Sequence, residues 1–254
     1  MDRLIYSSLS AMRGLMAKQT TTASNLANVN TTGFRGEMAV ATPTWLTGRG
    51  GPAAAQGMIG RADMAEGVLD ADMAEGAVSE TGRPLDIALE GDALVTVQPA
   101  EGGEAYTRRG DLSVNEAGLL TNGDGVPVLG EGGPITLPPA DKIQIDPTGV
   151  IWIAPVGSDP AQPLQQVDRL KLVSSAGSRI AKGLDGLFRV EAGGTLPSDP
   201  DARLRSGALE GSNVNASKAL VDMIGASRDW EMQVKMLTTA QDLDKASADL
   251  MRLD

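Results

Sequence analysis

The sequence contains neither cysteine nor histidine, and it has few aromatic residues: three Trp, two Tyr and two Phe among 254 residues. Without thiolate or imidazole groups, a Cys-His nucleophile, a Ser-His-Asp triad and a zinc site of ordinary ligands are all excluded. No phosphate-binding glycine loop and no G-x-S-x-G nucleophile pattern occurs either. We therefore expect that the protein is not an enzyme and uses no metal, no cofactor and no small-molecule substrate.

Long apolar runs and clusters of positive charge are also missing. No stretch approaches the roughly 18 apolar residues of a membrane span, so we expect no membrane insertion. A net charge of -11 and a pI near 4.5 would repel a phosphate backbone, so nucleic acid is not an expected partner. Residues 1–8 lack the apolar core of a cleaved secretory signal, and we expect the start of the chain to be retained.

Glycine and proline, by contrast, are abundant, with 31 and 14 residues. Between residues 34 and 210 they separate short runs of alternating or β-branched residues, a pattern typical of many short strands. Residues 122–125 (NGDG) and 146–149 (DPTG) have the residue types of tight hairpin turns. The middle of the chain is therefore predicted to be mostly β, apart from residues 41–61, whose composition favours a flexible or assembly-dependent stretch.

Both ends of the chain carry apolar residues at alternating spacings of four and three, which predicts amphipathic helices over residues 3–27 and 214–250. The first stripe consists of Ile5, Leu9, Met12, Met16, Gln19, Ala23 and Leu26. The second consists of Ala216, Leu220, Met223, Ser227, Trp230, Val234, Leu237, Gln241, Asp244, Ala248 and Met251. Asn213 and Asn215 precede the second stripe and are candidate helix caps.

These patterns predict an α+β fold in which long N- and C-terminal helices pair as a coiled coil, with a central mostly-β domain. The expected domains are residues 1–33 with 211–254 (helical), 34–79 (connecting) and 80–210 (β-rich). Because Ile224 and Met236 lie outside the stripes, a single helix pair would leave apolar surface exposed, and further copies of the chain could cover it. Periodicity equally allows the alternative that both helices pack against the β region of a monomer.

Residues 24–35 (SNLANVNTTGFR) resemble the N-terminal signature of the flagellar rod and hook axial proteins. Residues 209–215 (LEGSNVN), 220–224 (LVDMI) and 228–232 (RDWEM) resemble the C-terminal signature of the same family. The family form usually has Gln at the place of Ser227 and Tyr at the place of Trp230. Residues 85–92, 106–111 and 118–130 are similar to its β-domain strands, so the resemblance spans nearly the whole chain.

The resemblance implies a structural subunit of the bacterial flagellar basal-body rod, which transmits torque for motility. Residues 1–6 and 231–236 are most similar to the proximal-rod member, and the distal-rod member is the alternative. Such proteins are exported unfolded by the flagellar type III apparatus without a cleaved signal and assemble in the periplasm. In the family the terminal helices form an inner tube and the β domain faces outward. The implied partners are other copies, neighbouring rod proteins and the export apparatus.

We therefore expect the functional residues to form an assembly interface from both signatures and both helical stripes. They are Leu9, Met12, Met16, Ala23, Leu26, Asn28, Asn30, Gly33, Phe34, Asn213, Asn215, Leu220, Met223, Trp230, Val234 and Leu237. Two other classes of protein stay open: a soluble periplasmic binding module, and a hydrolase that uses paired acids. The acids in residues 66–80 are interpreted as a solvated surface, because they are dense in a Gly- and Ala-rich stretch.

Overall fold

The computed structural model describes residues 2–39, 42–45, 62–65, 69–157 and 162–251. The chain divides into two compact units. Unit 1 comprises residues 1–27, 37–70 and 215–254, and unit 2 comprises residues 28–36 and 71–214. Of the stretch predicted to be flexible, residues 41–61, only 42–45 are described, so most of that prediction lies outside the described residues.

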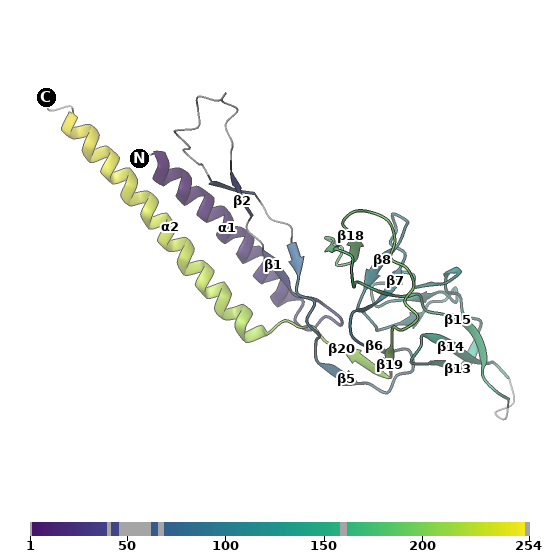
Figure 1. The fold of residues 1–254 in the computed structure, drawn as a ribbon. Helices are drawn as coiled ribbons and strands as arrows, with labels where there is room; N and C mark the ends of the chain where they lie inside the picture. The colour runs from purple at the N-terminus through teal and green to yellow at the C-terminus, as the bar shows by residue number, and fades with distance from the viewer. Residues whose placement is uncertain (1, 40–41, 46–61, 66–68, 158–161, 252–254) are drawn as a thin grey trace, which may run out of the picture. The chain divides into compact units, whose positions relative to one another are not determined.

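Unit 1 contains the two helices, α1 (Asp2–Ala27) and α2 (Ala216–Met251). They lie side by side and antiparallel, so that the end of α1 is beside the start of α2 (Figure 1). Asn215 caps α2, because its side-chain oxygen accepts a 3.0 Å hydrogen bond from the amide of Lys218. Neither described helix has an apolar stretch sufficient to cross a lipid bilayer.

The buried faces of the two helices consist of small side chains. On α2, Ala219, Ala226 and Ala240 are buried, and each stands one position before a residue of the predicted stripe. On α1, Ser8 and Thr22 are buried, again one position before predicted residues. The Thr22 hydroxyl donates a 2.8 Å hydrogen bond to the carbonyl of Lys18, which satisfies it within the helix. Small side chains let the two backbones approach closely, whereas several larger apolar side chains, among them Leu9, Met16 and Leu220, are exposed.

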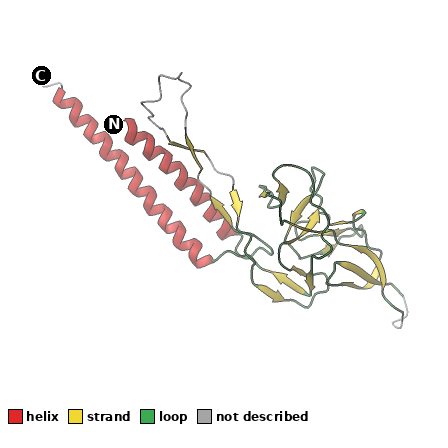
Figure 2. Ribbon diagram, viewed as in Figure 1, coloured by secondary structure: helices red, strands yellow, loops and turns green. Residues whose placement is uncertain are grey.

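The predicted fold class, an α+β fold whose terminal helices pair as a coiled coil, is contradicted by the structure. The described residues form 2 helices and 20 short strands, so the chain is strand-rich (Figure 2). The predicted stripes are not buried between the helices: Leu9 is 43% exposed, Met16 56% and Leu220 49%. The spacing was correct in period but wrong in face, since a heptad pattern marks an apolar stripe without saying what covers it.

Unit 1 also contains short strands that follow α1. They are β1 (Glu37–Ala39), β2 (Thr42–Trp45), β3 (Ala62–Ala65) and β4 (Leu69–Ala71), the last of which ends at the boundary with unit 2. β2 and β3 pair antiparallel, and β1 pairs with β4. The side chain of Asn25 in α1 fixes the start of β1 through two hydrogen bonds to the backbone of Glu37, at 2.8 and 2.7 Å. α1 and the first strand are thus joined by one asparagine.

Unit 2 is built from sixteen strands in small antiparallel sheets. The strands are β5 (Val78–Glu80), β6 (Ile87–Leu89), β7 (Ala93–Val97), β8 (Ala105–Thr107), β9 (Ser113–Val114), β10 (Leu120–Thr121), β11 (Leu129–Gly130), β12 (Gly133–Pro134), β13 (Ala140–Ile145), β14 (Val150–Pro155), β15 (Gln165–Arg169), β16 (Leu172–Ser174), β17 (Ile180–Lys182), β18 (Phe188–Val190), β19 (Leu204–Ser206) and β20 (Ala208–Glu210). The largest sheet has the order β16-β7-β8-β18-β17, and β13-β14-β15 form a second one.

The five-stranded sheet separates two hydrophobic cores. Strand β7 is buried along its whole length, and its alternating side chains enter different cores: Val95 lies in the larger one and Leu94 in the smaller. In the smaller core the Tyr106 hydroxyl accepts a 2.6 Å hydrogen bond from the amide of Leu196. Because this buried phenol has a backbone partner, it costs little to bury. Few aromatic residues suffice, since each core is thin.

The two predicted hairpin turns are present. Asp146 accepts backbone hydrogen bonds from Thr148 and Val150 at 2.8 and 3.0 Å, in the turn between β13 and β14. Asn122 accepts equivalent bonds from Asp124 and Val126 at 3.0 and 2.9 Å. Asp and Asn side chains that bond to the backbone two and four residues on stabilise such turns without help from distant residues. These two turns could therefore be predicted from the local sequence.

Candidate assembly site

The predicted interface residues of α1 are mostly exposed. Leu9, Met16 and Ala23 follow one another at intervals of seven residues and are all exposed, so they lie along one line of the helix surface. Met12 and Leu26 are half-buried. Apolar side chains that recur along the outside of a helix cost free energy in water, so they mark a surface for which a partner would be favourable.

α2 also carries exposed apolar side chains. Five residues of α2 belong to the predicted site. Two of them, Leu220 and Val234, are exposed, at 49% and 40%, whereas Met223, Trp230 and Leu237 are half-buried. Further exposed apolar side chains on the same helix were not among the predicted site residues. They are Val221, Ile224, Met232, Met236 and Leu243. Of these, Ile224 and Met236 are the two that the sequence analysis names as apolar residues outside the stripe.

The other predicted residues lie where the chain passes between helix and strand. Asn28, half-buried, closes a turn after α1 in which the Thr31 amide donates to the Asn28 carbonyl at 3.1 Å. Asn30 is exposed. Gly33 is buried with φ +65°, and a Cβ there would lie 2.4 Å from the carbonyl oxygen of Arg108. Only glycine fits this close backbone contact, which explains its place in the signature.

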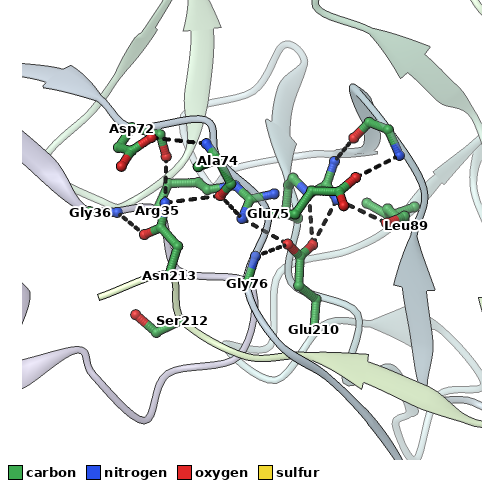
Figure 3. A network of polar contacts seen from close by, with 12 residues as sticks. Arg35, Gly36, Asp72, Ala74, Glu75, Gly76, Leu89, Glu210, Ser212 and Asn213 are labelled. Carbon is green, nitrogen blue, oxygen red and sulfur yellow. Dashed lines mark hydrogen bonds and ion pairs between the residues drawn. The ribbon is translucent and has the colours of Figure 1, made fainter. Parts of the chain in front are cut away.

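Residues 33–36 and 210–213 run side by side in the same direction. The Gly33 amide donates to the carbonyl of Glu210 at 2.8 Å, and the Asn213 amide donates to the carbonyl of Phe34 at 3.3 Å. The Asn213 side chain also accepts a 2.7 Å bond from the Gly36 amide (Figure 3). Gly33 and Asn213 therefore hold the chain's own segments together, and their hydrogen-bonding groups are used within unit 2.

A buried charge cluster lies beneath this contact and consists of Arg35, Arg108 and Glu210. Each of these side chains is at most 1% exposed. One oxygen of Glu210 is 2.7 Å from a guanidinium nitrogen of Arg35, and the other is 2.8 Å from Arg108. The same carboxylate accepts a 2.8 Å bond from the Gly76 amide (Figure 3). One carboxylate thus forms ion pairs with two buried guanidinium groups.

The two arginines of the charge cluster differ in how well they are satisfied. Arg108 donates to the backbone carbonyls of Leu89, Gly91 and Ala93 in addition to Glu210. Arg35 donates to the carbonyl of Ala74 at 2.6 Å, but its Nε and Nη2 atoms have no hydrogen-bond partner among the residues that the structure describes. Burial, together with the nearby Arg108 charge, lowers the pKa of Arg35 despite Glu210. Arg35 is therefore the more costly of the two buried cations.

Segment 71–76 has the same six residues as residues 62–67 (ADMAEG), and it supplies backbone groups to the same contact. Asn213 donates to the carbonyls of Asp72 and Ala74 at 2.8 and 3.0 Å, and Arg35 donates to Ala74 as well (Figure 3). The contribution of this segment comes from backbone carbonyls, which no side-chain pattern reveals.

A lysine from the five-stranded sheet contacts the N-terminal signature. The ammonium group of Lys182, in β17, lies 3.5 Å from the centre of the half-buried Phe34 ring and donates a 2.9 Å hydrogen bond to the carbonyl of Arg35. A cation over an aromatic face is attracted by the ring electrons. Phe34 is thus held within unit 2, whereas it was predicted to lie in an assembly interface.

Comparisons with known proteins give matches at both ends and in the middle of the chain. Residues 5–35 match the family model "Flagella basal body rod protein", residues 88–153 match "Flagellar hook protein FlgE/F/G D1 domain", and residues 205–250 match "Flagellar basal body rod FlgEFG protein C-terminal". Arg35, Arg108 and Glu210 each fall in a different one of these three segments.

Full-length relatives agree with these matches. The chain is 41% identical to the flagellar basal-body rod protein FlgF of Escherichia coli, with 95% of each chain covered. It is 39% identical to FlgF of Salmonella typhimurium, with 100% of each covered. Similarity extends to the rod protein FlgG of Bacillus subtilis, at 30% identity over 99% of this chain and 100% of that protein.

Proposed function

The chain belongs to the flagellar basal-body rod protein family and is a structural subunit of the rod, and from this premise we propose that it assembles through the exposed apolar faces of α1 and α2. The faces comprise Leu9, Met16 and Ala23 on α1, and Leu220, Val221, Ile224, Met232, Val234, Met236 and Leu243 on α2. The observation that carries the proposal is that large apolar side chains such as Leu9, Met16 and Leu220 are exposed, while the small Ala219, Ala226 and Ala240 are buried.

The free energy available from these faces is sufficient to drive association. Full burial of an exposed Leu, Ile, Val or Met side chain contributes about 1.5–3 kcal/mol, so a side chain that is half exposed contributes about 1 kcal/mol. Several such side chains on each helix can offset the cost of immobilising a subunit. The partners that fit are further copies of this chain and neighbouring rod proteins.

We assign the subunit to the proximal part of the rod because its identity is 41% to E. coli FlgF and 30% to B. subtilis FlgG. Acting as a rod subunit, it carries torque mechanically and performs no catalysis. We further propose that the flagellar type III export apparatus delivers the chain to the periplasm without signal cleavage. In the assembled rod, the division expected from sequence would hold, with helices lining the inside and the β-rich residues 80–210 outside.

The test replaces one exposed leucine on the helices and one elsewhere. Leu9→Asp puts a charge on the proposed contact face of α1, so we expect loss of swimming and absence of the protein from purified basal bodies. Leu184→Asp is the matched control, since Leu184 is fully exposed in the turn between β17 and β18 of unit 2. Circular dichroism checks that both variants fold. Normal swimming by Leu9→Asp would refute assembly through this face.

A further inference from the structure

Glu210 is a single carboxylate that two buried cations share, although one cation belongs to the N-terminal signature and the other to the end of strand β8. Arg35 and Arg108 are both within 2.8 Å of it, and none of the three side chains is more than 1% exposed. Without Glu210, two guanidinium groups would be buried close together, and the remaining acid that acts on Arg35 would be the exposed Glu75. Such a state is strongly unfavourable in a low-dielectric interior.

We infer that Glu210 acts as a lock: the N-terminal segment, residues 28–36, stays closed onto the rest of unit 2 only while the C-terminal segment, residues 208–213, is docked. The N-terminal segment brings Arg35 into the interior, and Glu210 is the acid that makes its burial tolerable. The two segments are also joined by hydrogen bonds that the backbone amides of Gly33 and Asn213 donate. Closure of the N-terminal segment therefore depends on Glu210, a residue of the C-terminal segment.

The unpartnered atoms of Arg35 indicate which segment opens when Glu210 is lost. Arg108 has three backbone carbonyls besides Glu210, so it can stay in place when the acid is absent. In the part of the chain that the structure describes, the side-chain donors Nε and Nη2 of Arg35 have no partner even in the closed form, and only Ala74 and Glu210 receive its remaining donors. The first part of unit 2 to open on loss of Glu210 should thus be the segment that carries Arg35.

Amide hydrogen exchange on the full-length chain tests the lock. Glu210→Gln keeps the shape of the side chain and removes its charge. We expect exchange at Gly33 and Gly36 to accelerate on the order of a hundredfold. The amide of Leu120, which bonds to the carbonyl of Ile135 in the larger core, reports whether unit 2 remains folded and should change little.

A second variant separates charge from lost hydrogen bonds. In Glu210→Gln with Arg35→Met, the cation that needed the acid is gone, so exchange at Gly33 and Gly36 should return to within about tenfold of the unmodified chain. Asp146→Asn is the control, because it neutralises a half-buried carboxylate in another turn of unit 2 and should leave both amides unchanged.

Three outcomes would overturn the lock. These are no acceleration in Glu210→Gln, acceleration confined to residues 208–213, or a double variant that exchanges as fast as Glu210→Gln alone. The coupling would operate within one chain whether or not that chain assembles. The exchange measurement and the basal-body measurement with Leu9→Asp can therefore fail independently.

Discussion

Gly33 shows how a single residue can be required for a reason unrelated to the surface it was predicted to form. Its φ of +65° lies in the left-handed region, and its α-carbon faces the backbone of Arg108 with no room for a Cβ. A side chain here would push apart the N-terminal signature and the end of β8. The requirement for glycine is thus internal to unit 2, and it acts on the position of Arg35 two residues later.

At this scale we expect Gly33→Ala to lower the free energy of unfolding of unit 2 by about 2–4 kcal/mol, from backbone strain together with the clash. The comparison is Gly82→Ala, where φ is +71° but nothing lies within 4 Å of the added Cβ. Gly82→Ala should cost only about 1 kcal/mol, the strain alone. Urea unfolding followed by tryptophan fluorescence measures both, and equal losses would contradict the clash with Arg108.

The helices show what periodicity can and cannot predict. Spacings of four and three placed helices over residues 3–27 and 214–250, close to the α1 and α2 of the structure. They did not identify the packed face, which lies one residue earlier, at Ala219 and Ala226 in place of Leu220 and Ser227. A search for hydrophobic spacing picks out the larger apolar side chains, whereas the face on which these two helices pack closely consists of smaller ones.

The charge cluster of Arg35, Arg108 and Glu210 could not be predicted from the sequence, for a different reason. Arg108 and Glu210 are 102 residues apart, and nothing in the local pattern of either indicates that they meet. Hairpin turns such as residues 146–149 were predictable because their hydrogen bonds are local. Long-range polar contacts depend on how the sheets stack, and strands of two or three residues give no register from which to infer it.

For the helical element, we expect Ala226→Leu to destabilise the packing of α1 on α2 by about 1–3 kcal/mol, since Ala226 is 2% exposed and has no space for a larger side chain. Ser227→Leu adds the same side chain at the next position, which is exposed, and should be nearly neutral. Thermal unfolding at the helical circular-dichroism band distinguishes them. A more harmful Ser227→Leu would mean that the packed face is the one originally predicted from spacing.

Over the whole molecule, charge is distributed unevenly between the two units. The sequence ranges of unit 2 contain 21 Asp and Glu residues against 12 Lys and Arg, while those of unit 1 contain 12 and 10. The unit with the exposed apolar helix faces is therefore nearly neutral, and the β-rich unit carries most of the net charge of -11. Neighbouring subunits would attract through one unit and repel through the other.

This imbalance predicts that salt promotes self-association of the purified chain. Raising NaCl from about 0.05 to 0.5 M shortens the screening length to a few ångströms and weakens repulsion between acidic units, while burial of apolar helix surface is retained. Sedimentation velocity should show larger species at the higher salt concentration. Leu9→Asp should not respond in this way, and association that weakens with salt would mean that ion pairs hold subunits together.

The parallel contact between residues 33–36 and 210–213 means that the segment of unit 2 that follows α1 and the segment that leads into α2 lie next to each other. In terms of architecture, the connections of unit 2 to the two helices are fixed to each other. Loops between its strands can therefore lengthen, shorten or be exchanged without changing the separation of the segments that lead to α1 and α2. A family of subunits can in this way vary the bulk and surface of one module while keeping a common helical module for stacking.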